Sequence, residues 1–492
     1  MRAVLGVDVG TSSTKGILVA LDGTILGTAV REHSVNRPEP GMVEMDAAQW
    51  WKEFSEISRE LLTKNHAEVI AVGVSGMGPC VTIADESAQA LRPAILYGVD
   101  TRATEQIRAL TLELGETEIV DRCGSALSTQ SVGPKLAWLG EHEPEAMERA
   151  KLLFMPSSWL AFHLTGNYVL DHHSASQCTP MYDTMLRQWH QPWSQLVAPN
   201  IDLPTLVWPG DIVGAVTASA SEQTMIPAGV AVIAGTIDAW SEAISIGAQN
   251  VGDLMLMYGT TMFLINTTDQ RLTSNVLWGT IGAIPGTHNL AGGMATSGAI
   301  TGWLRELVGS PDYSDLIAEA SESGPGGRGL VMLPYFAGER TPIADPKAKG
   351  LIAGLTLDHN RGDLYRATLE ATAFGVRHNI EALATAGGQT NRVVAVGGGT
   401  QGGLWTQVVS DVTGHEQEIP TITIGASFGA AFLAASAVAD VSIESWNPIS
   451  RSVKPRRELT EFYDELYAIY RELYVATAAL SHRLGDAARL RT

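Results

Sequence analysis

Val4–Gly16 reads VLGVDVGTSSTKG, and this stretch decides how the rest of the chain is interpreted. Its apolar run Val4–Val7 predicts a buried strand that ends at the carboxylate of Asp8. A loop of small residues, Gly10–Ser13, follows, and Lys15 opens a second strand. Glycine lets backbone approach an anion, hydroxyl and N–H groups donate to phosphate oxygens, and a carboxylate can hold a hard cation through its waters. The stretch therefore predicts a phosphate cradle, and a plain β-hairpin with a polar turn is the alternative.

The length of 492 residues exceeds what one hydrophobic core supports, so two large domains, or three, are expected. The formal net charge of -20, with no local basic stripe, argues against nucleic acid as a partner. The substrate should be neutral, or an anion that arrives with a metal. We expect no membrane partner, because no stretch of about 18 apolar residues occurs and Asp8 would interrupt a signal peptide. The three cysteines lack the spacing of a zinc site, so a reducing cytoplasm is the expected location.

The second half of the chain repeats the opening pattern. Gly252–Thr261, GDLMLMYGTT, is a strand that runs into a Gly-Thr-Thr loop, as Gly6–Thr11, GVDVGT, does. A further pair consists of Val69–Gly76, VIAVGVSG, and Val393–Gly399, VVAVGGG. In addition, a strand around Val230 leads through a loop that leaves Asp238 at or near a helix N-terminus. Two related α/β halves facing each other across a cleft would explain both pairs, and chance similarity of glycine-rich strand ends is the alternative.

Two polar pairs in the first half carry weaker predictions. Asp100 and Arg102 lie at a strand end before a helix, where a carboxylate and a guanidinium can bind hydroxyl groups. A structural ion pair is the equal alternative. The neighbouring His172 and His173 do not predict a metal site, because adjacent side chains point in different directions and no third ligand is spaced to join them.

A glycine pattern late in the chain resembles a dinucleotide-binding motif. Gly397, Gly399 and Gly402 satisfy GxGxxG, and Glu418 lies near the distance of a ribose-binding acid. The pattern alone is weak evidence, and hydride transfer would leave the carboxylates described above without a role. A dehydrogenase is therefore disfavoured.

The C-terminal half also contains helical patterns. Asp363–Leu383 predicts a long helix, Ser427–Ala435 predicts a helix whose small residues allow close approach, and Gly324–Gly329 predicts a flexible surface turn. Leu459–Leu484 predicts a long amphipathic helix that covers the core or forms an oligomer face, such as that of a homodimer. Its apolar residues are Phe462, Leu466, Ile469, Leu473 and Leu480.

Together these segments resemble the FGGY family of carbohydrate kinases, and within it the xylulokinases. The family belongs to the superfamily of actin, hexokinase and the heat-shock chaperone ATPases. The matching blocks follow the family's order along nearly the whole chain: GVDVGTSSTKG at Gly6, PKLAWL at Pro134, GTIDA at Gly235, YGTT at Tyr258, GERTP at Gly338, GLIAGLTLDHNRGDLYRATLEA at Gly350, GGGTQGGLWTQVVSDVTG at Gly397 and ASFGAAFLA at Ala426. The resemblance implies an α/β fold of two actin-like, ribonuclease H-like domains around a central cleft. Residues 1–246 would bind the sugar and carry the catalytic base, and residues 247–492 would bind the nucleotide.

The resemblance also implies roles for individual residues. Asp8 would organise the Mg²⁺ that bridges the ATP phosphates, and Asp238 would take the proton from the sugar hydroxyl and share the metal site. Nucleotide contacts are implied for Gly10, Thr11, Ser12, Ser13, Lys15, Gly259, Thr260, Thr261, Gly398, Gly399 and Gln401. Sugar contacts are implied for Met77, Gly78, Asp100, Arg102 and Asp238. The cleft should close over sugar and nucleotide, because an open site would let water compete for the phosphoryl group.

The sugar-facing segments depart from the usual xylulokinase pattern. Xylulokinases usually follow the strand at Val74 with glycine, glutamine, methionine and histidine, whereas Gly76–Cys80 reads GMGPC here. The usual tryptophan-asparagine-aspartate run is altered to YGVD at Tyr97–Asp100, and the common asparagine after the catalytic aspartate is replaced by Ala239. The sequence thus predicts an ATP-dependent sugar kinase with a ketopentose such as xylulose as the first candidate substrate. Ribulose, a tetrulose, erythritol or glycerol are alternatives, and an actin-like ATPase acting on a protein partner is the rival from another class.

Overall fold

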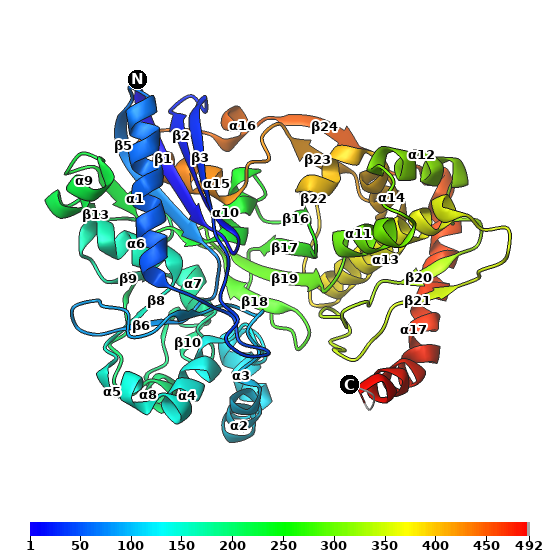
Figure 1. Ribbon diagram of the computed structural model, residues 1–492, viewed down its shortest axis with the longest axis horizontal. Coiled ribbons are helices and arrows are strands. Elements are labelled where there is room, and N and C mark those ends of the chain that lie inside the picture. Colours follow the sequence, from blue (N-terminus) through cyan, green and yellow to red (C-terminus); the bar gives the residue numbers. More distant parts are fainter. Residues whose placement is uncertain (490–492) are drawn as a thin grey trace. The chain divides into compact units, whose positions relative to one another are not determined.

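The computed structural model describes residues 1–489 and contains two compact α/β units (Figure 1). The first unit comprises Met1–Gln249, Thr268–Asn289 and Ile422–Pro448, and the second comprises Asn250–Thr267, Leu290–Thr421 and Ile449–Thr492. The chain therefore passes between the units several times, and the single boundary at residues 246/247 stays a prediction. Within residues 1–489, no helix has the length and apolar character that crossing a membrane requires.

The first unit is built on a mixed sheet with the strand order β13-β14-β5-β1-β2-β3. β1 pairs with β2 in antiparallel fashion and with β5 in parallel fashion. The strands are β1 (Arg2–Val9), β2 (Ser13–Ala20), β3 (Ile25–Glu32), β5 (Glu68–Gly76), β13 (Ile212–Ala215) and β14 (Ala231–Ile233), and β15 (Thr236–Ile237) pairs with β5 off this path.

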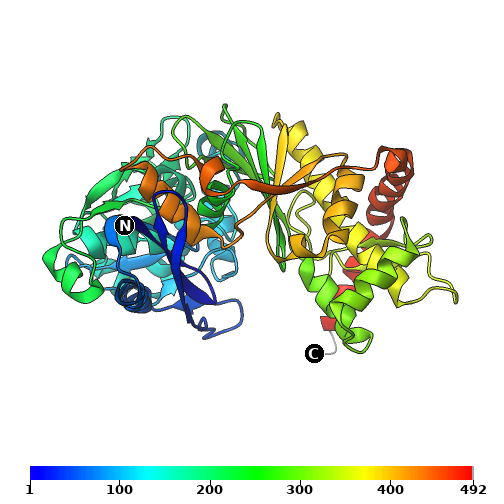
Figure 2. The same cartoon turned by 90° about the horizontal axis from the view of Figure 1, so that it is seen from above.

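Glycines on the strands let helices approach both faces of this sheet (Figure 2). On one face a Cβ added to Gly16 would lie 2.2 Å from Ile57 Cγ2 of α1 (Ala47–Lys64). On the other face a Cβ on Gly6 would lie 2.1 Å from the Ser427 carbonyl oxygen of α15 (Ala426–Ser436), and one on Gly73 would lie 1.9 Å from that of Ala430. The close-approach helix predicted near residue 427 is confirmed, because only glycine leaves room for its backbone.

The remaining elements of the first unit surround this core. Its further helices are α2 (Thr104–Leu114), α3 (Glu116–Cys123), α4 (Val132–His142), α5 (Pro144–Arg149), α6 (Pro156–Thr165), α7 (His172–Ser176), α8 (Gln191–Val197), α9 (Ala218–Thr224), α10 (Asp238–Ser245) and α16 (Ile443–Trp446). Its short strands are β4 (Glu44–Met45), β6 (Thr82–Ala84), β7 (Ala94–Ile95), β8 (Leu152–Phe154), β9 (Val169–Asp171), β10 (Tyr182–Asp183), β11 (Gln188–Trp189), β12 (Thr205–Val207) and β18 (Trp278–Ile281).

The sheet of the second unit repeats the order of the first. Its strands run β24-β23-β22-β16-β17-β19, and the central β16 pairs with β17 in antiparallel fashion and with β22 in parallel fashion. They are β16 (Asp253–Tyr258), β17 (Met262–Thr268), β19 (His288–Met294), β22 (Arg392–Val396), β23 (Gln417–Pro420) and β24 (Ile449–Val453). β16 thus corresponds to β1 and β22 to β5, which confirms the two related halves inferred from the sequence.

Five helices and a small hairpin complete the second unit. They are α11 (Gly298–Leu307), α12 (Tyr313–Ser323), α13 (Arg361–Thr385), α14 (Leu404–Thr413), α17 (Thr460–Arg489), β20 (Val331–Leu333) and β21 (Leu351–Ala353). α13 confirms the predicted long helix, but residues 365–376 are buried on all sides rather than on one face.

The face that α17 buries differs from the predicted one. Tyr463, Tyr467 and Tyr470 are buried, whereas Ile469 is 41% exposed and Leu480 is 54% exposed. The hydroxyl of Tyr470 shares a 2.7 Å hydrogen bond with that of Tyr335, so a buried tyrosine hydroxyl finds a hydrogen-bond partner inside the core. The expectation that this apolar stripe covers the core was therefore wrong, and an oligomer face on the stripe stays a prediction.

The glycine turn near residue 326 is also packed more closely than predicted. Gly326 and Gly327 are buried, and the N–H of Gly326 donates to Glu370 Oε1 at 2.8 Å. A Cβ on Gly326 would lie 2.5 Å from Phe462 Cζ. These glycines therefore belong to the packing of α13 and α17.

Candidate active site

The first acidic group of the candidate site is Asp8, near the end of β1. The parallel register places it beside Ser75 of β5, whose Oγ donates a 2.8 Å hydrogen bond to Asp8 Oδ1. The carboxylate is buried, with the residue only 8% exposed. Burial raises the pKa of Asp8 to about 6, although the hydrogen bond from Ser75 and the charge of Lys15 act in the opposite direction.

The second acidic group is Asp238, the first residue of α10. Its Oδ1 accepts a 2.7 Å hydrogen bond from the N–H of Ala239, as suits a carboxylate at a helix N-terminus. Burial, and then the negative charge of Asp8, raise the pKa of Asp238 to about 8. The structure thus brings together two carboxylates, Asp8 and Asp238, that lie 230 positions apart in the sequence.

A third carboxylate, Glu242, lies one helical turn after Asp238 on the same face of α10. Burial and the charge of Asp8 raise its pKa to about 7, whereas the charge of Lys15 lowers it. The sequence analysis assigned no role to Glu242. The spacing of four residues from a candidate catalytic acid was the signal that could have identified it.

These carboxylates fit a hydrated Mg²⁺ ion. Mg²⁺ prefers hard oxygen ligands and usually takes one or two carboxylates together with waters and substrate phosphates. A cation between Asp8 and Asp238 would offset the repulsion that raises the pKa of Asp238. Residues 1–489 contain no group of three or more acidic, histidine or cysteine side chains that could hold a metal ion.

The loop Gly10–Ser13 follows directly from β1 and forms a tight turn. The N–H of Gly10 donates to the Ser13 carbonyl at 3.0 Å, and the backbone N–H of His33 donates to the Ser12 carbonyl at 3.0 Å. The hydroxyl of Thr11 shares a 2.9 Å hydrogen bond with that of Tyr97. The loop therefore begins directly after β1, the strand that carries Asp8, as the sequence predicted.

Of the residues implied in sugar binding, Met77 lies close to the loop. The hydroxyl of Thr11 donates to Met77 Sδ at 3.7 Å, and Met77 is buried. A Cβ on Gly78 would lie 2.6 Å from Ile237 Cγ1, so the residue before Asp238 fills the space that a larger residue 78 would need.

Asp100 and Arg102 form a buried ion pair. Arg102 Nη2 lies 2.7 Å from Asp100 Oδ2, which also accepts a 2.6 Å hydrogen bond from the N–H of Val43. Arg102 Nη1 lies 2.7 Å from Glu44 Oε1. The arrangement corresponds to the structural ion pair that the sequence left open as the alternative. Both side chains are engaged by the protein itself.

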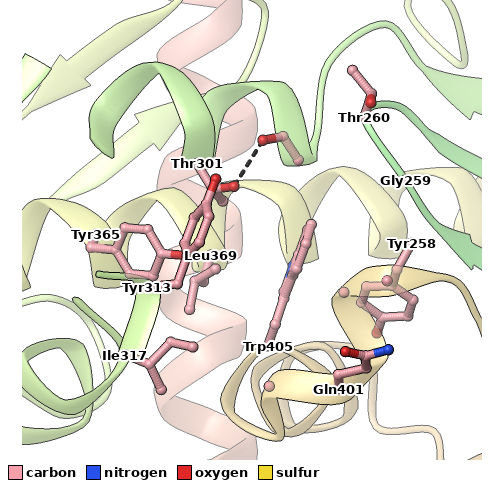
Figure 3. Close-up of a pocket in the computed structure, with 14 residues that line it drawn as sticks. Tyr258, Gly259, Thr260, Thr301, Tyr313, Ile317, Tyr365, Leu369, Gln401 and Trp405 are labelled. Atoms are coloured by element: carbon pink, nitrogen blue, oxygen red, sulfur yellow. Dashed lines mark hydrogen bonds between the residues drawn. The ribbon is translucent and has the colours of Figure 1, made fainter. Parts of the chain in front are cut away.

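The second unit contains a pocket of about 520 Å³ (Figure 3). Five of the residues implied in nucleotide binding line it, namely Gly259, Thr260, Gly398, Gly399 and Gln401. Thr261, which belongs to the same loop, is not among the lining residues. The pocket also has apolar and aromatic walls from α11–α14, formed by Gly298, Thr301, Tyr313, Ile317, Tyr365, Leu369 and Trp405.

Trp405 and the start of α11 are among the lining features that the sequence analysis missed. Trp405 Nε1 donates to Thr372 Oγ1 at 2.8 Å, and its ring meets that of Tyr258 edge-on at 5.2 Å, so its orientation is fixed. The N–H of Gly298 donates to the Gly259 carbonyl at 3.0 Å, which places the N-terminus of α11 against the Gly-Thr-Thr loop.

The repeated sheet, the carboxylate pair in one unit and the ligand-sized pocket in the other define a class of protein, the two-domain α/β sugar kinases. Comparison with known proteins agrees. The model of the N-terminal domain of the FGGY family of carbohydrate kinases matches residues 3–245, and that of the C-terminal domain matches residues 254–438. The chain belongs to the FGGY family of carbohydrate kinases, and it is a sugar kinase.

Individual relatives cover nearly the whole chain. A xylulose kinase of Escherichia coli is 27% identical over 480 residues, which span 96% of this chain and 98% of the relative. A glycerol kinase of Nocardia farcinica is 31% identical over 458 residues, spanning 89% and 90%. The crystal structure of xylulose kinase from Rhodospirillum rubrum is similar with a TM-score of 0.92 at 30% identity, covering 98% of this chain and 100% of that chain.

Proposed function

We propose that this protein transfers the γ-phosphoryl group of ATP, with Mg²⁺, to a hydroxyl of a ketopentose such as xylulose. The similarity to xylulose kinases over nearly the full length supports this choice of substrate. A glycerol kinase matches as well, so a polyol or another ketose is the second candidate. The observation that carries the proposal is the electrostatic coupling of two buried carboxylates, Asp8 and Asp238.

Asp238 is the proposed catalytic base. With Mg²⁺ bound beside it, the raised pKa of Asp238 would fall, so the side chain would be ionised and able to accept the hydroxyl proton. Phosphoryl transfer has a loose transition state, so the hydroxyl proton leaves late and alignment matters more than basicity. The hydrogen bond from Ser75 holds the Asp8 carboxylate, the second acidic group of the proposed metal site, at a fixed position.

Nucleotide binding is divided between loops and pocket in this proposal. The donors of Gly10–Ser13, together with Lys15, hold phosphate in the first unit. In the second unit Gly259, Thr260 and Thr261 hold phosphate. Gly398, Gly399 and Gln401, with the Trp405 and tyrosine rings of the pocket, enclose the adenosine. Aromatic and apolar walls with a few polar groups are typical of sites for flat ligands.

On the sugar side, Met77 and Gly78 form part of the proposed pocket wall. The side chain of Ile237 occupies the space beside Gly78. A larger residue at position 78 would therefore give the pocket wall a different shape. We assign Asp100 and Arg102 the task of holding the Tyr97 segment beside Thr11, since their polar atoms are engaged with each other and with the backbone. The cytoplasmic location and a homodimer through α17 stay predictions.

A coupled assay of ADP release tests the proposal. Purified protein is incubated with Mg²⁺ and ATP and with each member of a panel: xylulose, ribulose, a tetrulose, erythritol and glycerol. We expect one member to raise turnover well above the basal rate and Asp238→Ala to remove that increase. If no sugar or polyol raises turnover, and Asp238→Ala leaves the basal rate unchanged, the proposal is wrong.

A further inference from the structure

A buried network of side chains lies behind the loop Gly10–Ser13. His33, the residue after β3, has its side chain only 1% exposed. Its Nε2 lies 3.0 Å from the Gly10 carbonyl oxygen, and its backbone N–H donates to the Ser12 carbonyl at 3.0 Å. A single residue therefore binds two carbonyl groups of the loop.

Glu53 of α1 fixes the ring of His33 from the other side. His33 Nδ1 lies 2.9 Å from Glu53 Oε2, and that oxygen also accepts a 2.5 Å hydrogen bond from the hydroxyl of Thr14. The other carboxylate oxygen accepts a 2.8 Å hydrogen bond from Gln49 Nε2. The network thus ties together α1, the strand β2 that follows the loop, and the loop itself.

The hydrogen-bond partners determine where the protons lie. A carbonyl oxygen only accepts, so His33 Nε2 must donate to Gly10. The other ring nitrogen, Nδ1, faces Glu53 Oε2 at 2.9 Å. Both ring nitrogens of His33 are therefore held by fixed partners, directly behind the loop that is proposed to hold phosphate.

We propose that His33, held by Glu53, is a positioning residue for the phosphate loop. The inference rests on the proposed role of Gly10–Ser13 in binding ATP. By drawing the carbonyls of Gly10 and Ser12 toward β3, His33 turns the negative ends of these peptide dipoles away from the phosphate side. Dipoles that are fixed in a buried site act on a bound anion without reorganisation.

Substitutions at His33 and Glu53 separate the bond to the loop from the contact that orients the ring. His33→Ala removes the bond to Gly10, and we expect the KM for ATP to rise about tenfold while the KM for the sugar stays unchanged. His33→Gln can still donate to the same carbonyl, so most of the affinity should return. Glu53→Gln removes the carboxylate that orients the ring while Nε2 can still donate, and we expect about a threefold rise.

A matched control is His163→Ala. His163 is another histidine of the first unit, and its ring packs against those of Trp51 and Trp159. Its loss should lower thermal stability and leave the KM for ATP unchanged. Hydrogen exchange of the backbone amides of residues 10–13 gives a readout independent of turnover, and His33→Ala should accelerate it whereas His163→Ala should not.

The outcomes distinguish this inference from the proposed function. If wild type phosphorylates a sugar and His33→Ala changes neither the KM for ATP nor the exchange of the loop, His33 does not position it. The inference is equally overturned if His163→Ala has the same effects as His33→Ala. If wild type shows no sugar kinase activity, the proposed function fails, and the exchange rates alone decide whether His33 orders the loop.

Discussion

Replacing Asp8 by asparagine should make the ligand-free protein more stable at alkaline pH while it abolishes phosphoryl transfer. Asparagine keeps the shape of the side chain, and its Oδ1 can still accept the hydrogen bond from Ser75. It removes the negative charge that contributes to the raised pKa of Asp238. The gain in stability and the loss of activity then have the same cause, namely a carboxylate that the fold buries for a cation.

The size of the effect follows from the pKa of Asp8. Folding raises this pKa from 3.8 to about 6, so the folded state disfavours the ionised carboxylate by roughly 3 kcal/mol relative to the unfolded state. For a carboxyl with a raised pKa, the contribution to stability is complete below the unfolded value and is lost as the pH rises through the folded value. Asp8→Asn should therefore gain roughly 3 kcal/mol at about pH 8 and roughly a third of that at about pH 4.5.

Thermal unfolding without divalent cations, followed by fluorescence at both pH values, measures this difference. Glu86→Gln, an exposed carboxylate in a loop, is the control and should change the midpoint little at either pH. Steady-state assays with excess Mg²⁺ should show that Asp8→Asn has lost sugar phosphorylation. A variant that is destabilised at pH 8, or whose gain is the same at both pH values, would refute the electrostatic reasoning.

Three further predictions concern other parts of the molecule. Asp238→Asn should lower kcat by about 10³-fold and leave ADP binding intact, as titration calorimetry can show, because the base acts only in the transfer step. Gly73→Ala should lower the free energy of unfolding by about 3 kcal/mol, because the added Cβ would lie 1.9 Å from the Ala430 carbonyl oxygen. Denaturant titration measures this change, and an unchanged midpoint would contradict the close packing of α15 on the sheet. Trp405→Ala should weaken ADP binding about tenfold in the same calorimetric assay, since the ring lines the pocket; unaltered affinity would remove Trp405 from the proposed site.

The repeat of the two sheets could be predicted because its signal is local. Each central strand is an apolar run that ends in a glycine-threonine loop, at Gly10 and at Gly259. Such a strand end needs no information about distant contacts to be recognised. The close-approach helix near Ser427 could be predicted for the same reason, because its small residues stand next to one another in the sequence.

The buried face of α17 could not be predicted in this way. Hydrophobic spacing favours the aliphatic residues, but the core against which α17 packs offers Tyr335 and the ion pair of Arg366 and Glu370 as partners. Tyr463 accepts a 2.7 Å hydrogen bond from Arg366 Nη2 and donates one of 2.9 Å to Glu370 Oε1. These groups become visible only once α13 and α17 are packed together, so the tertiary context overrides the local pattern.

The candidate site shows the same division. Asp8 and its loop belong to one short motif, whereas the walls of the pocket in the second unit come from α11, α12, α13 and α14. Tyr313, Tyr365 and Trp405 carry no common motif that would group them. Their contribution depends on how four helices meet, which spacing along the chain does not encode.

The repeat also explains why the two units carry different chemistry at the same place in the same sheet. In the first unit the parallel register pairs Asp8 with Ser75 at the carboxyl end of the central strands. At the corresponding position in the second unit, the parallel register of β16 and β22 pairs Met257 with Val396. A carboxylate and its hydroxyl partner are thus exchanged for two apolar side chains, and the strand end leads into an aromatic pocket instead of an acidic one. Because each sheet presents its strand ends at one edge, this exchange removes the strand-end carboxylate from the second unit, whose pocket walls come from α11, α12, α13 and α14.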